Sequence, residues 1–433
     1  MKYMPRKGYS LLALVVVASM VWGEDSFAQP TPQNPSGAGT SQPPAAGQTG
    51  SQPGSAQIAP RTLPNNLQNN QTTPQRPSEA DVAAASNTAT PLTGGNQTSN
   101  PNDVRMLGDQ GPLGVPAVAF GPRFNIPGVP PVPPIPGTQG PLSRGAVLAP
   151  SQRGIKVADN QSPMPQDRLY FNFNYFDNLN RAANERLGID VHDVNAYSYT
   201  FGVEKTFLDG DASVGLRVPI NSLSTVSGSA GFDGTWTDIG NLTVILKYLV
   251  FKDEQGDALS AGLAVTAPTG PNSFAGASQF ATPNPTVIQP FMGYRVILGQ
   301  DLFLQGFFAG DFPTDQSDVT MFFSDVGLGY FLLRRGQDSP NILTAIVPTF
   351  EVHVNNPLNH RGAFNGYDVV GTADVVNLTT GVTFEINHRS TFTVGIVTPV
   401  TGPKPFDIEA LAQVNWSFGY TARRGQPVIN NLN

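Results

Sequence analysis

Twelve stretches of the chain beyond residue 166 alternate between apolar and polar side chains. In the first stretch, residues 169–175, asparagine takes positions 172 and 174 and leucine or an aromatic residue takes the odd positions. A period of two places one class of side chain on each face of a β-strand. The alternation therefore predicts twelve strands, centred on residues 169–175, 197–204, 212–218, 241–249, 259–267, 286–297, 302–310, 320–332, 342–354, 375–386, 391–400 and 408–420.

The connections between these stretches alternate between long and short. The long ones span about 177–195, 221–236, 268–285, 311–318, 355–373 and 401–407, and the short ones about 206–211, 251–257, 298–301, 333–341 and 387–390. Short turns at one rim and long loops at the other are typical of bacterial outer-membrane barrels. We predict an all-β fold, an antiparallel up-and-down transmembrane barrel of about twelve strands over residues 166–420, followed by a C-terminal tail at 421–433.

The two faces of the predicted strands separate this fold from a soluble β-sandwich. A soluble sheet turns its apolar face to a dry core and a charged face to water. Here the polar face is mostly Asn, Ser, Thr, Gly and Gln, and the apolar face is almost uncharged. Aromatic residues gather near the strand ends, as in the interfacial girdles of membrane barrels: Tyr175, Tyr197, Phe322, Tyr330, Phe350, Trp416, Phe418 and Tyr420.

The N-terminal part of the chain has a different texture. Residues 1–28 combine basic residues, a short apolar run at 11–22 and small residues before position 29, which predicts a cleaved signal peptide. Residues 29–165 are rich in Gln, Pro, Gly and Asn, and such a composition predicts a disordered linker. Within it, residues 127–136 are typical of polyproline II, as a stiff spacer or as a docking strip.

Composition narrows the chemistry. The chain has no cysteine, which excludes disulfides, thiolate metal sites and cysteine nucleophiles. Its net charge of −7 makes nucleic acid an unfavourable partner. We find no P-loop, dinucleotide fingerprint, zinc-binding His pair or nucleophile elbow, and therefore predict no enzyme, with no catalytic, cofactor-binding or metal-binding residues.

The alternation also predicts which charged side chains face the lumen. Their mixture of signs indicates internal ion pairs or, alternatively, a selectivity filter. Glu351 and His353 share that face, so acid–base chemistry is a second, weaker reading of a hydrogen-bonded cluster. Residues 167–420 hold 25 acidic and 13 basic residues, which favours cations. The predicted lumen-facing residues are Arg168, Glu204, Arg217, Lys247, Arg295, Asp325, Glu351, His353, Glu385 and Glu409.

Several phrases of residues 167–420 resemble one family. Residues 238–248 resemble the "GD-L-LG-KY" strand of the outer-membrane family named for the MetA pathway of phenol degradation. Residues 216–220 resemble its "LR-P" strand and residues 259–270 its "G-PTG" strand end, while 325–330 and 347–353 fit later strands. The resemblance implies a transporter-like outer-membrane barrel and brings no catalytic residues.

These observations predict a function and its partners. The protein is expected to be an outer-membrane channel for passive or facilitated diffusion of small solutes, including apolar or aromatic ones that follow Phe291, Phe323 and Phe331. The alternative is a barrel that anchors or displays the N-terminal tail, with an autotransporter-like barrel as a weaker variant. The predicted partners are the lipid bilayer, an unidentified solute and the assembly machinery, whose recognition signal the strand at 409–420 resembles.

Overall fold

The structure is a computed structural model of the whole chain. The chain divides into two units, residues 1–93 and 94–433, and every residue described below belongs to the second. The predicted signal peptide, the polyproline segment 127–136, Tyr420 and the tail 421–433 lie outside the described residues. The structure describes residues 104–111, 116–120, 146–186, 191–227, 233–253, 255–278, 284–316, 318–336, 339–361 and 372–419.

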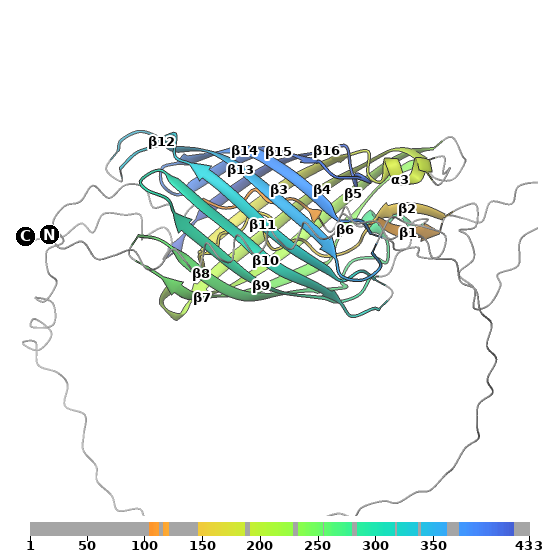
Figure 1. Cartoon of the computed structure of the whole chain (residues 1–433), viewed down its shortest axis with the longest axis horizontal. Helices are drawn as coiled ribbons and strands as arrows, with labels where there is room; N and C mark the ends of the chain where they lie inside the picture. Colours follow the sequence, from red (N-terminus) through yellow and green to blue (C-terminus); the bar gives the residue numbers. More distant parts are fainter. Residues whose placement is uncertain are drawn as a thin grey trace, which may run out of the picture. The chain divides into compact units, whose positions relative to one another are not determined.

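Twelve antiparallel strands form a closed barrel (Figure 1). Each strand pairs with its neighbours along the chain, the last strand β16 pairs with the first strand β3, and the ring is therefore complete. The predicted fold class is confirmed, and each of the twelve predicted stretches holds one strand. The barrel strands are β3 (Arg168–Asp177), β4 (Val191–Phe207), β5 (Ala212–Ser227), β7 (Leu242–Lys252), β8 (Ala258–Ala267), β9 (Val287–Ile297), β10 (Leu302–Pro313), β11 (Met321–Tyr330), β13 (Leu343–Pro357), β14 (Val375–Ile386), β15 (Ser390–Pro399) and β16 (Ile408–Ser417).

Two rims follow from the connections. Short turns, such as residues 253–257 between β7 and β8, define the short-turn rim, where β3 begins and β16 ends. Longer connections, such as residues 178–190 between β3 and β4, define the long-loop rim. This second rim carries the helix α3 (Arg181–Arg186) and the 3₁₀ turn η5 (Phe274–Gly276). None of the helices in the described part of the chain is long and apolar enough to cross a membrane.

Some strands exceed or fall outside the predicted stretches. β5 continues to Ser227 between two pairing partners, β4 and the additional strand β6 (Gly234–Ile239), which begins in a predicted loop. β12 (Leu333–Arg334) adds two residues beside β13. Within the predicted linker, β1 (Pro116–Phe120) and β2 (Ala146–Pro150) form a separate two-stranded ladder.

The outer face of the barrel is an apolar belt. In β7 the side chains of Leu246 and Tyr248 are about half exposed, whereas those of Ile245 and Lys247 are buried. The same alternation leaves Phe350 of β13 and Trp416 of β16 exposed. An uncharged belt around a barrel without open strand edges is the surface that a lipid bilayer covers. The fold is therefore a transmembrane barrel in contact with lipid.

The lumen is occupied by two segments of the chain itself. Residues 104–110 and 151–166 lie inside the barrel, and all but Gly154 among them are buried. We call them the first pass and the second pass, and together the plug. The prediction of a disordered linker is wrong for these residues, because polar side chains that cannot form a core of their own find hydrogen-bond partners on the polar inner wall.

Candidate functional site: the filled lumen

The first pass runs from the short-turn rim towards the long-loop rim. Val104 packs in an apolar cluster with Phe303 and Phe331, which lie beside the short turns. Six residues later, Gln110 donates a hydrogen bond to Asn174 near the middle of β3 (3.3 Å). Between them, Asp109 accepts a hydrogen bond from Asn377, close to the start of β14 at the long-loop rim (2.7 Å).

The second pass runs in the opposite direction. At the long-loop rim, Arg153 forms ion pairs with Asp311 (2.8 Å) and Asp318 (2.7 Å). Burial raises the pKa of the Asp318 carboxyl above its usual range, and the Arg153 guanidinium opposes this shift. At the other end, the backbone N–H of Gln166 donates to Glu204 beside the short-turn rim (3.2 Å). Arg153 therefore fixes the entry of the second pass and Glu204 its exit.

The two passes meet the wall at the ammonium group of Lys156. Its Nζ lies 2.6 Å from Asp109 Oδ1 of the first pass and 2.6 Å from Asp325 Oδ1 of β11, and it donates to Asn355 Oδ1 of β13 at 2.8 Å. The four side chains are buried. Both carboxylates are desolvated and therefore need a positively charged partner, and they share the single charge of this ammonium group. One lysine thus ties both passes to the barrel.

Glu351 and His353 extend this cluster on β13. The two Glu351 oxygens accept hydrogen bonds from the backbone N–H groups of Leu107 and Gly108, both at 2.8 Å. The Nδ1 atom of His353 lies 2.8 Å from Asp325 Oδ1, and its Nε2 atom lies 3.2 Å from Glu351 Oε2. Glu351 therefore holds the first pass, and His353 joins its carboxylate to that of Asp325.

This geometry bears on the acid–base and metal readings of the cluster. Asp109, Asp325 and His353 bring their ligand atoms within 4.8 Å of one another, a spacing that suits a metal ion. The Lys156 ammonium already lies between the two carboxylates, however, and would repel a divalent cation there. Asp325, Glu351 and His353 are each at most 1% exposed, so no substrate can reach them while the plug is in place.

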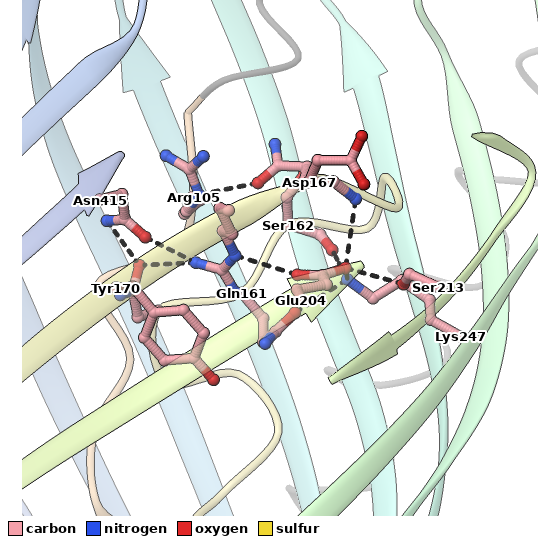
Figure 2. A network of polar contacts seen from close by, with 12 residues as sticks. Arg105, Gln161, Ser162, Asp167, Tyr170, Glu204, Ser213, Lys247 and Asn415 are labelled. Carbon is pink, nitrogen blue, oxygen red and sulfur yellow. Dashed lines mark hydrogen bonds and ion pairs between the residues drawn. The ribbon is translucent and has the colours of Figure 1, made fainter. Parts of the chain in front are cut away.

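A second polar cluster lies at the short-turn rim (Figure 2). Glu204 pairs with Arg168 (2.9 Å) and with Lys247 (3.1 Å). Lys247 also donates to the Gln161 side chain and to the Ser162 carbonyl, both at 2.8 Å. Glu204 is therefore paired with two basic residues of the wall, and the second pass binds this group through Lys247 and through the backbone N–H that Glu204 accepts.

Arg217 of β5 binds the backbone of the second pass. Its guanidinium donates to the Lys156 carbonyl (3.0 Å), to the Asp159 carbonyl (2.6 Å) and to the Tyr170 hydroxyl (3.0 Å). The backbone turns at this point, since Asp159 N donates to the Lys156 carbonyl (3.2 Å). Arg217 therefore gives the Lys156 carbonyl a second hydrogen-bond donor and supplies a charged donor to the Asp159 carbonyl.

The three remaining predicted residues lie on the same inner face and have hydrogen-bond partners in the barrel itself. Arg295 donates to the Gly256 carbonyl in the β7–β8 turn (2.8 Å), Glu385 accepts from Thr344 (2.9 Å) and Glu409 accepts from Asn174 (2.7 Å). All ten predicted lumen residues are at most 6% exposed. The structure thus places them inside, in two clusters and several separate contacts, rather than in one ring.

Sequence reasoning missed the residues of the plug. Arg105, Asp109, Arg153, Lys156 and Asp159 lie in a tract that the composition assigned to a linker. A signal was present, because these charges alternate with apolar residues such as Met106 and Val157 in a tract otherwise poor in both. Local enrichment of this kind distinguishes a segment that binds a wall from one that remains in solvent.

The plug also covers the three phenylalanines that were predicted to line a path for solutes. Phe291 and Phe323 belong to one buried apolar cluster with Met106 and Val157 of the plug, and Phe331 packs with Val104. The expectation that this strip lines an open route for solutes is wrong for the structure described here. These aromatic side chains instead supply the apolar contacts that fix the two passes.

The similarity of this chain to known proteins is confined to solved structures with low sequence identity. No family model and no curated protein matches the chain, so the resemblance to the MetA-pathway family remains a prediction. Among solved structures the chain is similar to the COG4313 outer membrane channel from Pseudomonas putida F1, with 13% identity over 61% of this chain and 100% of that chain (TM-score 0.44). It is also similar to the KdgM porin (9% identity, 58% and 99%, TM-score 0.34) and to the beta domain of the Bordetella autotransporter BrkA (12% identity, 59% and 100%, TM-score 0.37). These similarities are too low to assign a function, and the barrel is assigned from its own strand pairing.

Proposed function

We propose that this protein is a channel-type barrel of the outer membrane, closed at rest by its own plug, and that small polar solutes cross it when the plug moves. The observation that carries the proposal is the filled lumen: both passes are buried, and hydrogen bonds and ion pairs join them to the wall at several points. Free diffusion through the resting barrel, as the sequence predicted, is not supported by this arrangement.

The chemistry of the wall supports polar solutes. Its buried positions are rich in Asn, Gln, Thr and Ser, such as Asn172, Gln289 and Thr379. Side chains of this kind exchange a partner in the plug for water or solute at a modest net cost, because each hydrogen bond is replaced by another. A twelve-stranded barrel is narrower than the porins of 16–18 strands that leave a wide channel, so the solutes must be small.

The proposed location is the outer membrane of a Gram-negative-type cell, reached through a cleaved signal peptide and the outer-membrane assembly machinery. The apolar belt and the closed ring of strands support the membrane location. The mature chain is expected to fractionate with the outer membrane and to migrate differently on gels before and after heating. Recovery in a soluble fraction without detergent would contradict this proposal.

Single-channel recording in planar bilayers tests the proposed closure. The full chain is expected to give rare openings, and a variant without residues 29–165 is expected to give steady conductance. A gel shift on heating shows for each variant that the barrel has folded. Steady conductance of the full chain would refute closure by the plug.

An anchoring barrel is the second candidate, and Lys156 is the observation that favours it. Of its two buried ion pairs at 2.6 Å, one joins the two passes to each other and the other joins them to the wall, and breaking a buried pair costs about 3–5 kcal/mol. A barrel held shut so firmly can serve as an anchor alone. If the folded variant without residues 29–165 stays silent, the anchoring function replaces the channel.

A further inference from the structure

The two passes have opposite directions, and each can be followed from contact to contact. The first pass enters beside Phe303 at the short-turn rim and reaches Asn377 near the long-loop rim. The second pass begins at Asp311 and Asp318 on the long-loop rim and ends beside Glu204 on the short-turn rim. The chain therefore travels through the lumen once in each direction before β3 begins.

The lengths of the two passes agree with this path. The first pass has seven residues, which can span at most about 25 Å, because an extended chain reaches roughly 3.3–3.6 Å per residue. That is close to the height of the apolar band of a membrane barrel, about 25 Å. The second pass is longer, and its excess is taken up by a turn in which Gln161 N donates to the Ala158 carbonyl (3.3 Å).

Between the two passes, the structure describes a ladder of two strands that lies at the long-loop rim. β1 and β2 pair there as an antiparallel ladder, with Phe120 opposite Ala146, so the connection between these two residues starts and ends at one place. β2 lies against α3, the helix in the long connection between β3 and β4 (Figure 1). The ladder is thus at the end of the barrel opposite to the one where β3 begins and β16 ends.

We infer that the barrel carries a hairpin of its own chain through its lumen and presents the β1–β2 ladder on the outer side of the membrane. The short turns of outer-membrane barrels face the periplasm and the long loops face the exterior. A hairpin that enters at the short-turn rim and returns to it has its tip outside. The barrel then serves as the conduit and the holder of this hairpin, which is a function separate from solute passage.

Accessibility of single cysteines in intact cells tests this inference. The chain has no cysteine of its own, so each variant carries one reactive thiol. Ala146→Cys and Val147→Cys place the thiol on the two faces of β2, because successive strand residues point in opposite directions. The probe is a membrane-impermeant maleimide, added to cells that carry the full chain in their outer membrane.

Two variants of the same chain calibrate the two sides of the membrane. Lys404→Cys replaces an exposed residue of the long β15–β16 connection, and Gln255→Cys replaces an exposed residue of the short β7–β8 turn. We expect Lys404→Cys and at least one β2 variant to react in intact cells. Gln255→Cys is expected to react only after the outer membrane is permeabilised.

Three results would overturn the inference. If both β2 variants react only after permeabilisation while Lys404→Cys reacts in intact cells, the ladder lies on the periplasmic side. If they react only after denaturation, the ladder is enclosed by the barrel. If Gln255→Cys reacts in intact cells and Lys404→Cys does not, the barrel has the opposite orientation. None of these results depends on conductance, so the inference and the proposed channel fail independently.

Discussion

At the scale of single residues, the plug depends on a few buried charges with several partners each. Lys156 contacts Asp109 and Asp325, and Glu351 accepts two backbone N–H groups of the first pass. Alternation in the sequence assigns Asp325 and Glu351 to the inner face but says nothing of their partners. The partners come from a segment more than 150 residues earlier in the chain, and only the folded structure brings the two together.

Replacing Lys156 with methionine is expected to release the plug while the barrel stays folded. The substitution leaves Asp109 and Asp325 buried without their ammonium partner, which costs about 3–5 kcal/mol. Docking of the plug should weaken by a factor of about 100 or more, since about 1.4 kcal/mol corresponds to a factor of ten. The fraction of time open in planar bilayers and protease cleavage within residues 104–166 measure the effect.

Lys205→Met is the matched control for that substitution. Lys205 also pairs with a buried aspartate, Asp167 at 3.0 Å, but its own side chain is 59% exposed. A pair of this kind contributes at most about 1 kcal/mol. Equal opening by both variants would show that Lys156 has no special part in holding the plug.

At the scale of elements, strands were predictable and the plug was not. A strand such as β7 alternates between buried and exposed residues along most of its eleven positions, so each further pair of residues adds evidence for which face is which. In the passes of the plug, charged and apolar residues alternate only over a few positions, such as 104–106 and 155–157, which is too short a run to identify a strand face. The position of the plug depends on the fit between its side chains and the inner wall of the barrel. Composition alone indicates only that such a segment cannot fold by itself.

The depth of a lipid-facing residue in β7 sets the cost of charging it. Leu246 lies near the middle of the strand, and Val250 lies near its short-turn end on the same outer face. Leu246→Arg is expected to destabilise the barrel by about 2–4 kcal/mol, and Val250→Arg by about 0–1 kcal/mol. Urea titration of the refolded barrels, followed by the gel shift on heating, measures the difference, and equal costs would contradict the depth assigned to β7.

A disulfide between the second pass and β8 is expected to lock the plug. A Cβ atom on Gly154 would lie 2.8 Å from the Cβ atom of Thr266, whereas disulfides place these atoms about 3.8 Å apart, so a shift of about 1 Å is needed. We expect Gly154→Cys with Thr266→Cys to suppress the openings of Lys156→Met under oxidising conditions. Reduction should restore them.

Either single cysteine with Lys156→Met is the control for this lock. Each introduces one of the two cysteines without the covalent bond, so its openings should not respond to reductant. If the double-cysteine protein conducts equally in both redox states although the disulfide has formed, ions pass without movement of the second pass.

At the scale of the whole molecule, the plug and the wall compensate each other in charge. The predicted lumen set has five acidic and four basic residues besides His353, and the plug adds three basic and two acidic ones. Removal of the plug also removes Arg153, which leaves Asp311 and Asp318 without their partner at the long-loop rim. Because the plug carries one more basic than acidic residue, the emptied barrel is more negative than the filled one by one charge, and two of its carboxylates have lost their partner.

We expect the variant without residues 29–165 to prefer cations, most strongly at low salt. Charges on exposed loops act over about 8–10 Å at physiological ionic strength and are screened further as salt rises, whereas charges on the narrow wall are screened less. Reversal potentials across a KCl gradient at low and high ionic strength separate the two sources. A preference that disappears at high salt assigns selectivity to the loops, and one that persists assigns it to wall residues such as Glu351 and Glu409. An anion preference at low salt would contradict both, because it requires that Arg217, Lys247 and Arg295 outweigh the carboxylates that the plug has released.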